Sequence, residues 1–435
     1  MHFRLVSCLF ICLLMVTSCQ DRPVEEDDRI YVERSSDGWR LMVDGQAFMV
    51  NGMNWDYFPV GTNYEYILWE ESDDFIREAL DYEMGLLSDM GVNALRIYTG
   101  IQPKWIEYIY DNFGIYTMLN HSFGRYGYPL GDEWVPVTDY TDETVIEILL
   151  DEVKNLAEEF KGTRGLLLYL LGNENNYGLF WAGSETEDFP EEQDEYLDQA
   201  RAMYQLFNKG ALAIKSVDDT RPVAFCNGDL LFLKKIIEEC QDIDIFGINT
   251  YRGISFTDLY ERVKNEYDKP VLLTEFGSDA FNAITKIEAQ REQALYNVEN
   301  WREIYENAAG LGKSENSIGG FTFQFSDGWW KYGQTTDLDV HNTEASWENG
   351  GYEFDHIPGE NNMNEEWFGI CAKGLTDKRD FYRLFPRAAY FAIAEAHRLD
   401  PFSPGMNLEK IRQHFSEIDI EEAYQTAQEF NAAEQ

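Results

Sequence analysis

The hydrophobic pattern of the chain alternates between amphipathic segments and short apolar runs. Helical periodicity covers residues 73–90, 103–113, 141–160, 191–217, 230–239, 256–267, 285–309 and 386–398. Apolar runs typical of strands buried on both faces begin near Phe48 and continue at residues 92–98, 115–120, 165–172, 222–227, 243–251, 270–275 and 319–325. Counted from Phe48, this makes eight strands. The pattern favours an α/β fold with a single (β/α)₈ TIM barrel over a doubly wound sheet.

Three segments fall outside this alternation. Residues 30–50 read as short strands joined by two Asp-Gly turns, which predicts a β-hairpin extension that caps the bottom of the barrel. Residues 326–380 are irregular and rich in Gly, Asn, Trp and Tyr, so we interpret them as a wall or lid over the barrel mouth. Residues 401–435 form an acidic, weakly helical C-terminal tail, either an appendage or partly disordered. The catalytic barrel with its hairpin then spans residues 29–400.

Two of the apolar strands end abruptly in a carboxylate. The fourth strand runs into Gly172-Asn173-Glu174, and the seventh into Thr274-Glu275-Phe276-Gly277. In a barrel, both glutamates project over the same C-terminal mouth. Either glutamate alone is better explained by a salt bridge or a helix N-cap. Together they match the pair of carboxylates that cleavage of a glycosidic bond requires.

These two motifs resemble the signatures of clan A glycoside hydrolases, in particular the family 2 barrel and the family 72 β-1,3-glucan transglycosylases. The resemblance covers roughly residues 49–398. It implies a retaining mechanism with Glu174 as general acid/base, Glu275 as nucleophile and Asn173 as a hydrogen-bond partner of the sugar 2-hydroxyl. Too few residues precede the first strand for the β-sandwich domains of family 2, and the disulfide-linked module of many family 72 proteins is missing. The resemblance therefore leaves the substrate open.

Further candidates come from other strand ends. Arg96 resembles the arginine beneath the nucleophile, where it would keep Glu275 ionised; an ordinary barrel ion pair is the alternative. Tyr251 ends the sixth strand, where the clan often has a tyrosine that touches the nucleophile, and a core or rim tyrosine is the alternative. His121 ends the third strand, where it could contact the substrate. A hydrogen-bonded structural histidine is the alternative. The candidates for stacking on sugar rings, each with core packing as the alternative, are Trp55, Trp181, Trp329 and Trp330.

The amino-acid composition limits the classes of molecule that the protein is expected to bind. The chain has 79 acidic and 35 basic residues and a net charge of −44, which disfavours nucleic acid and anionic lipid surfaces and favours neutral substrates. The alternative, which accounts for the larger part of the charge, is that it only keeps an exported protein soluble. Cys-x-x-Cys and His-x-His spacings are absent from the sequence, so we expect no catalytic metal, and no cofactor is implied. Nothing in the sequence indicates the oligomeric state.

The N-terminus predicts export. A basic start and a short apolar run precede Val16-Thr17-Ser18-Cys19, which resembles the lipobox of bacterial lipoproteins. This predicts a signal peptide at residues 1–18, a lipid on Cys19, an acidic tether at residues 19–28 and attachment to the bacterial cell envelope at the outer membrane, periplasmic or surface-exposed. An ordinary cleaved signal peptide is the alternative.

The sequence thus predicts a retaining hydrolase of β-glucan or β-linked oligosaccharides. A transglycosylase shares the first half of that reaction, so residues alone do not separate the two. A catalytically silent glycan-binding lipoprotein is the third interpretation, although the presence of both Glu174 and Glu275 argues against it.

Overall fold

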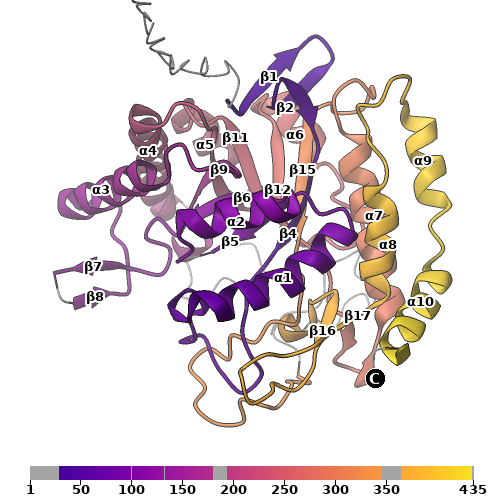
Figure 1. The fold of residues 1–435 in the computed structure, drawn as a ribbon. Coiled ribbons are helices and arrows are strands. Elements are labelled where there is room, and N and C mark those ends of the chain that lie inside the picture. The colour runs from indigo at the N-terminus through magenta and orange to yellow at the C-terminus, as the bar shows by residue number, and fades with distance from the viewer. Residues whose placement is uncertain (1–28, 99, 132, 180–193, 345–363, 434–435) are drawn as a thin grey trace, which may run out of the picture.

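The computed structural model describes residues 29–98, 100–131, 133–179, 194–344 and 364–433. Within them, eight parallel strands close into a barrel, which confirms the (β/α)₈ prediction (Figure 1). In spatial order these strands are β4 (Val50–Asn54), β5 (Ala94–Ile97), β6 (Tyr116–His121), β9 (Leu166–Leu171), β10 (Val223–Gly228), β11 (Ile245–Asn249), β12 (Val271–Phe276) and β15 (Ser317–Thr322). The ring closes where β15 pairs with β4, with Gly319 opposite Val50.

Helices surround the barrel in the predicted alternation. They are α1 (Asp73–Asp89), α2 (Pro103–Phe113), α3 (Glu143–Phe160), α4 (Asp194–Val217), α5 (Leu233–Glu239), α6 (Leu259–Glu266), α7 (Gln290–Glu306) and α8 (Ala388–His397). Local chemistry sets their ends: the Ser72 side chain caps α1 by accepting from the Phe75 amide, and α2 stops at Gly114, whose φ is +70°. Helix α7 starts later than predicted because β13 (Phe281–Asn282) and β14 (Ile287–Glu288) form a hairpin there.

The N-terminal segment closes the bottom of the barrel, as predicted. Strands β1 (Tyr31–Ser35), β2 (Gly38–Val43) and β3 (Gln46–Phe48) form an antiparallel sheet. Leu41 and Val43 of β2 belong to the same buried cluster as Met118 and Leu168 of the barrel strands. This apolar plug leaves the opposite, C-terminal end of the strands for chemistry.

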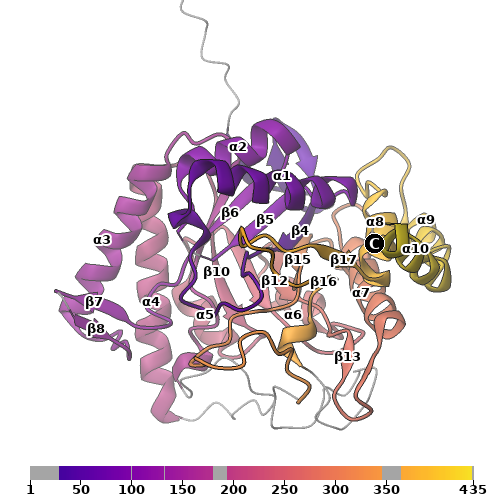
Figure 2. The ribbon, with the colours of Figure 1, turned by 60° about the horizontal axis from the view of Figure 1, so that its bottom comes forward.

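The segment after β15 lies at that C-terminal end. It contains the short helix η3 (Glu365–Trp367) and the antiparallel pair β16 (Cys371–Lys373) and β17 (Leu384–Pro386). Figure 2 shows β16 and β17 beside β15, and Ser326 bridges to Cys371. On the other side of the barrel, β7 (Tyr128–Leu130) and β8 (Glu133–Val135) form a hairpin that projects beside α3 (Figures 1 and 2).

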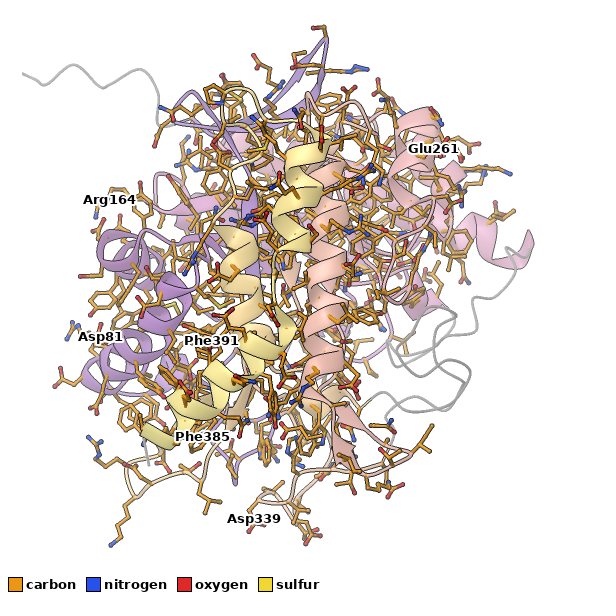
Figure 3. All side chains as sticks on the ribbon, turned by 90° about the vertical axis from the view of Figure 1, so that its right-hand side faces the viewer. Asp81, Arg164, Glu261, Asp339, Phe385 and Phe391 are labelled. Carbon is orange, nitrogen blue, oxygen red and sulfur yellow. The ribbon has the colours of Figure 1, made fainter. Side chains whose placement is uncertain are left out.

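The C-terminal tail is a docked appendage rather than a disordered one. Helices α9 (Leu408–Ser416) and α10 (Ile420–Ala433) lie along α7 and α8 (Figure 3). Phe415 packs on Tyr305 with ring centroids 5.5 Å apart, and Arg412 pairs with Glu306 at 2.8 Å. Among the residues described above, none of the helices has the length and apolarity needed to cross a membrane.

Candidate active site

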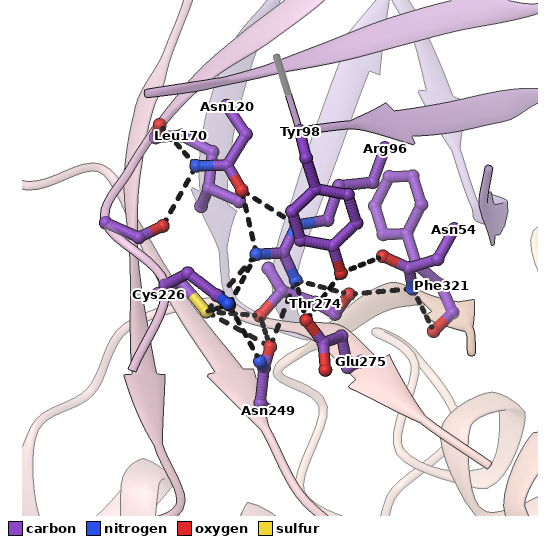
Figure 4. Close-up of polar contacts among 12 residues, drawn as sticks. Asn54, Arg96, Tyr98, Asn120, Leu170, Cys226, Asn249, Thr274, Glu275 and Phe321 are labelled. Carbon is purple, nitrogen blue, oxygen red and sulfur yellow. Dashed lines mark hydrogen bonds and ion pairs between the residues drawn. The ribbon is translucent and has the colours of Figure 1, made fainter. Parts of the chain in front are cut away.

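A single buried guanidinium, that of Arg96 on β5, ties the strand ends together. Its Nη1 lies 2.7 Å from Oε1 of Glu275 on β12 (Figure 4). Its Nη2 donates to the Oδ1 atoms of Asn120 on β6 and of Asn173 just after β9, both at 2.8 Å. Because these partners come from strands around the ring, one side chain fixes the relative positions of several strand ends.

The carboxylate of Glu275 also accepts hydrogen bonds from two tyrosines. Tyr98 donates its hydroxyl to Oε1 at 2.6 Å, and Tyr251 donates to Oε2 at 2.9 Å. Burial, with the nearby charge of Glu275, raises the pKa of both hydroxyls well above 10.0. Both tyrosines therefore stay protonated and act as donors. Glu275 is 7% exposed, so its contacts form in a largely water-excluded place.

A tight turn after β9 presents Glu174. Gly172 has φ +79°, and a Cβ there would lie 2.5 Å from Oδ1 of Asn175, so the turn requires glycine. Asn175 Oδ1 accepts from the Asn173 amide at 2.9 Å, and the Glu174 amide donates to the Cys226 carbonyl at 3.1 Å. Glu174 is 6% exposed and has φ +56°.

The two glutamates share an electrostatic neighbourhood at the C-terminal ends of β9 and β12. The charges of both Glu275 and Glu174 help to raise the pKa of Tyr251 and of the Cys226 thiol, for which burial is the main cause. Asn173, which directly precedes Glu174, contacts the same Arg96 that pairs with Glu275. The structure thus brings Arg96, Asn173, Glu174, Tyr251 and Glu275 together.

Several members of this network were missed from sequence. Tyr98 lies two residues after Arg96, so the alternation of a strand already puts both side chains on one face. Asn54 donates to the Thr274 carbonyl at 3.2 Å, and Asn249 donates to Asn173 Oδ1 at 3.1 Å. Asn54, Asn120 and Asn249 are polar residues at the ends of apolar strands, the same signal that identified Glu174.

Three of the expected substrate contacts have partners inside the protein. His121 lies 3.5 Å from Glu152 of α3 and accepts from the Phe123 amide, because the alternation that turns Asn120 inward turns His121 toward the helices. Burial lowers the pKa of His121 to about 4. Trp55 is buried and donates to Glu83 at 2.6 Å, and Trp329 is buried and donates to the Leu338 carbonyl at 2.8 Å. These contacts agree with the packing alternative for both tryptophans, and a role as a sugar platform stays a prediction.

Trp330 is the stacking candidate that stays next to the site. Its ring lies 5.8 Å from Phe323, which in turn lies 6.2 Å from Tyr251. Its Nε1 donates to Asp56 at 2.7 Å, which fixes the orientation of the indole. The predictions for Trp181 and Cys19 lie outside the described residues.

Comparison with protein families identifies the barrel. Residues 74–305, more than half of the chain, match the family model for the TIM barrel domain of glycosyl hydrolases family 2. The chain belongs to glycosyl hydrolase family 2. This agrees with the clan A resemblance, while the likeness to family 72 receives no support from it and stays a prediction. A comparison with curated proteins finds no match.

Solved structures show that the similarity of fold extends beyond the matched residues. A family 2 β-galacturonidase from Eisenbergiella tayi, bound to galacturonate, superposes with a TM-score of 0.51 at 16% identity, covering 85% of this chain and 54% of its own. A β-glucuronidase from Bacteroides uniformis gives a TM-score of 0.53 at 14% identity, covering 85% of this chain and 37% of its own. This family 2 chain thus spans about half or less of those proteins.

Proposed function

We propose that this family 2 protein is a retaining β-glycosidase in which Glu275 is the nucleophile and Glu174 the general acid/base. The observation that carries the proposal is the setting of Glu275, which accepts from Arg96 and two tyrosines at the end of β12. A carboxylate so oriented presents a lone pair in a fixed direction. The Arg96–Asn173 contact links it to the Glu174 turn.

In the first step, an oxygen of Glu275 attacks the anomeric carbon and the glycosidic C–O bond breaks. Glu174 gives its proton to the leaving oxygen, so that the departing alcohol is neutral. In the second step, Glu174 takes a proton from water while the water oxygen displaces Glu275 and restores its carboxylate. Asn173, held by Arg96, would donate from Nδ2 to the sugar 2-hydroxyl.

We favour a neutral β-linked substrate such as a β-glucan or a β-linked oligosaccharide. The net charge of −44 disfavours an anionic ligand. Three cations at this end of the barrel already hold carboxylates: Arg96 pairs with Glu275, Lys331 with Glu366 at 2.8 Å, and Arg387 with Asp327 at 2.6 Å. The sequences of residues 180–193 and 345–363 contain no Lys or Arg. This contrasts with the uronic acid named for the similar E. tayi structure.

The decisive experiment is hydrolysis of a panel of aryl β-glycosides, neutral sugars and glucuronide side by side. Glu275→Ala should lower kcat by about 10⁴-fold or more, the scale seen when an enzyme nucleophile is removed. Glu174→Gln should slow the hydrolysis of substrates with poor leaving groups more than that of dinitrophenyl glycosides, because the dinitrophenolate leaving group needs no proton. Glu261→Gln, on the exposed face of α6, is the matched control and should retain full activity.

Each alternative gives a different result. A transglycosylase would transfer the sugar to an acceptor at high acceptor concentration. A silent receptor would bind glycan equally in wild type and Glu275→Ala and cleave nothing. If the glucuronide were the best substrate and its cleavage depended on Arg125, whose guanidinium lies 5.2 Å from the Tyr126 ring, the neutral-sugar proposal would fail.

We also propose that the protein is a lipoprotein of the bacterial envelope, anchored through Cys19. The support is the sequence Val16-Thr17-Ser18-Cys19 after a short apolar run. Cys19→Ser should abolish labelling with radioactive palmitate and move the protein from the membrane to the soluble fraction. Unchanged labelling in that variant would contradict the proposal.

A further inference from the structure

The β7–β8 hairpin and the residues that flank it carry several exposed apolar side chains. Trp134 is 60% exposed and Tyr126 is 50% exposed, and Leu130 and Val137 of the same segment are also exposed. A cluster of this kind on a protein surface is typical of a binding site. The hairpin leaves the barrel between β6 and α3, at the C-terminal end of the strands (Figure 2).

This surface is connected directly to the candidate active site. The Tyr126 hydroxyl accepts from Nδ2 of Asn173 at 2.8 Å, and Asn173 contacts Arg96 through its other side-chain atom. The charges of Glu174 and Glu275 both act on the Tyr126 hydroxyl. Tyr126 is therefore the point where the polar site ends and the apolar surface begins.

Trp134 is held in place before any ligand arrives. Its Nε1 donates to the Tyr126 carbonyl at 3.2 Å. Between them lies Gly127, with φ +102°, where a Cβ would come within 2.9 Å of that same Nε1 and 2.2 Å of the Val135 carbonyl oxygen. Only glycine allows the indole to approach so closely. A fixed aromatic ring loses little conformational entropy on binding, which favours its use as a platform.

We propose that Tyr126 and Trp134 form an additional sugar subsite, which binds a residue of a β-linked oligosaccharide beyond the one that is cleaved. This inference rests on the proposed glycosidase function. Sugar rings have apolar C–H faces and polar rims, which suits an aromatic surface that continues into a polar site. The protein would then act on oligosaccharides or polysaccharides in preference to single-sugar glycosides.

The test compares kcat/KM for an aryl β-glycoside with that for β-linked oligosaccharides of increasing length. In wild type, kcat/KM should rise with length. Trp134→Ala should lower it about 5- to 10-fold for the oligosaccharides, the range for losing one aromatic contact, and by less than twofold for the aryl glycoside. Trp134→Phe should recover part of the loss. Trp39→Ala is the matched control, since this indole also donates on the surface, to Asp268, but at the other end of the barrel.

Binding to Glu275→Ala, measured by calorimetry with the same oligosaccharides, separates this inference from the glycosidase proposal. Weaker binding after adding Trp134→Ala would support the subsite even if no variant cleaved any substrate. Unchanged binding and unchanged length dependence in a folded Trp134→Ala protein would overturn it and leave the hairpin as a surface for another protein.

Discussion

At the scale of single residues, the site depends on the side chains that donate hydrogen bonds to the Glu275 carboxylate. The carboxylate has Arg96 and Tyr98 on one oxygen and Tyr251 on the other. Hydrogen bonds to a charged group contribute more than neutral ones, and those to the nucleophile must weaken as its charge is consumed during attack. Their main effect is thus to orient the attacking oxygen.

Removing one hydroxyl should slow the reaction while leaving the fold intact. We expect Tyr98→Phe and Tyr251→Phe each to lower kcat by about 10- to 100-fold, because the attacking oxygen of Glu275 is then less well oriented. The rate of labelling by a 2-fluoro sugar, which reports formation of the covalent intermediate, should fall in parallel. Tyr108→Phe is the control, because this hydroxyl also donates to a carboxylate, Asp81 at 2.6 Å, but on the surface of α2. A normal labelling rate in Tyr98→Phe would argue against Glu275 as nucleophile.

At the scale of elements, a buried ion pair holds together the two ends of the segment between β15 and α8. Arg387, just before α8, binds Asp327 through both terminal nitrogens, at 2.6 and 3.0 Å, and Glu288 of β14 at 2.7 Å. Both Arg387 and Asp327 are buried. The pair therefore joins the start of this segment to its end, across about sixty residues of chain.

Breaking this pair should be costly because Asp327 would stay buried without its partner. We expect Arg387→Ala to lower the free energy of unfolding by about 3–5 kcal/mol. Arg398→Ala, which removes an exposed ion pair with Glu395, should cost less than about 1 kcal/mol. Urea denaturation followed by circular dichroism measures both. Equal losses of unfolding free energy in the two variants would show that the buried pair does not stabilise the segment.

At the scale of the whole molecule, stability should depend on a buried acid outside the site. Glu83 of α1 is fully buried and accepts from Trp55, and burial raises its pKa to about 7 from 4.5, against the opposing charge of Lys373. The folded state therefore keeps a proton on Glu83 that the unfolded chain releases above about pH 4.5. Stability from this group is full below that pH and is lost as the pH rises through 7.

Glu83→Gln should remove this dependence, because glutamine keeps the acceptor for Trp55 and carries no charge. Relative to wild type, the variant should gain up to about 3 kcal/mol of unfolding free energy between pH 5 and pH 8. Glu78→Gln changes an exposed position on the same helix, so its free energy of unfolding should differ from that of wild type by the same amount at every pH. Urea denaturation midpoints at several pH values test this prediction. A stability difference between Glu83→Gln and wild type that does not change with pH would contradict it.

The sequence by itself determined the barrel, because alternating periods of two and 3.6 residues are local properties of the chain. It also marked Glu174 and Glu275 as the candidate catalytic pair, since carboxylates at the ends of buried strands have little to offer for packing. Boundaries were less exact: the hairpin at residues 281–288 interrupts a stretch whose periodicity reads as helix.

Only the tertiary structure decided which side chains face one another. Whether Trp55 is a platform or a core residue depends on Glu83, which is 28 positions away in the chain. His121 faces Glu152 and Tyr98 faces Glu275 because the barrel curves each strand against different neighbours. Side-chain periodicity says which face a residue is on, but contacts between distant segments arise only when the ring of strands closes.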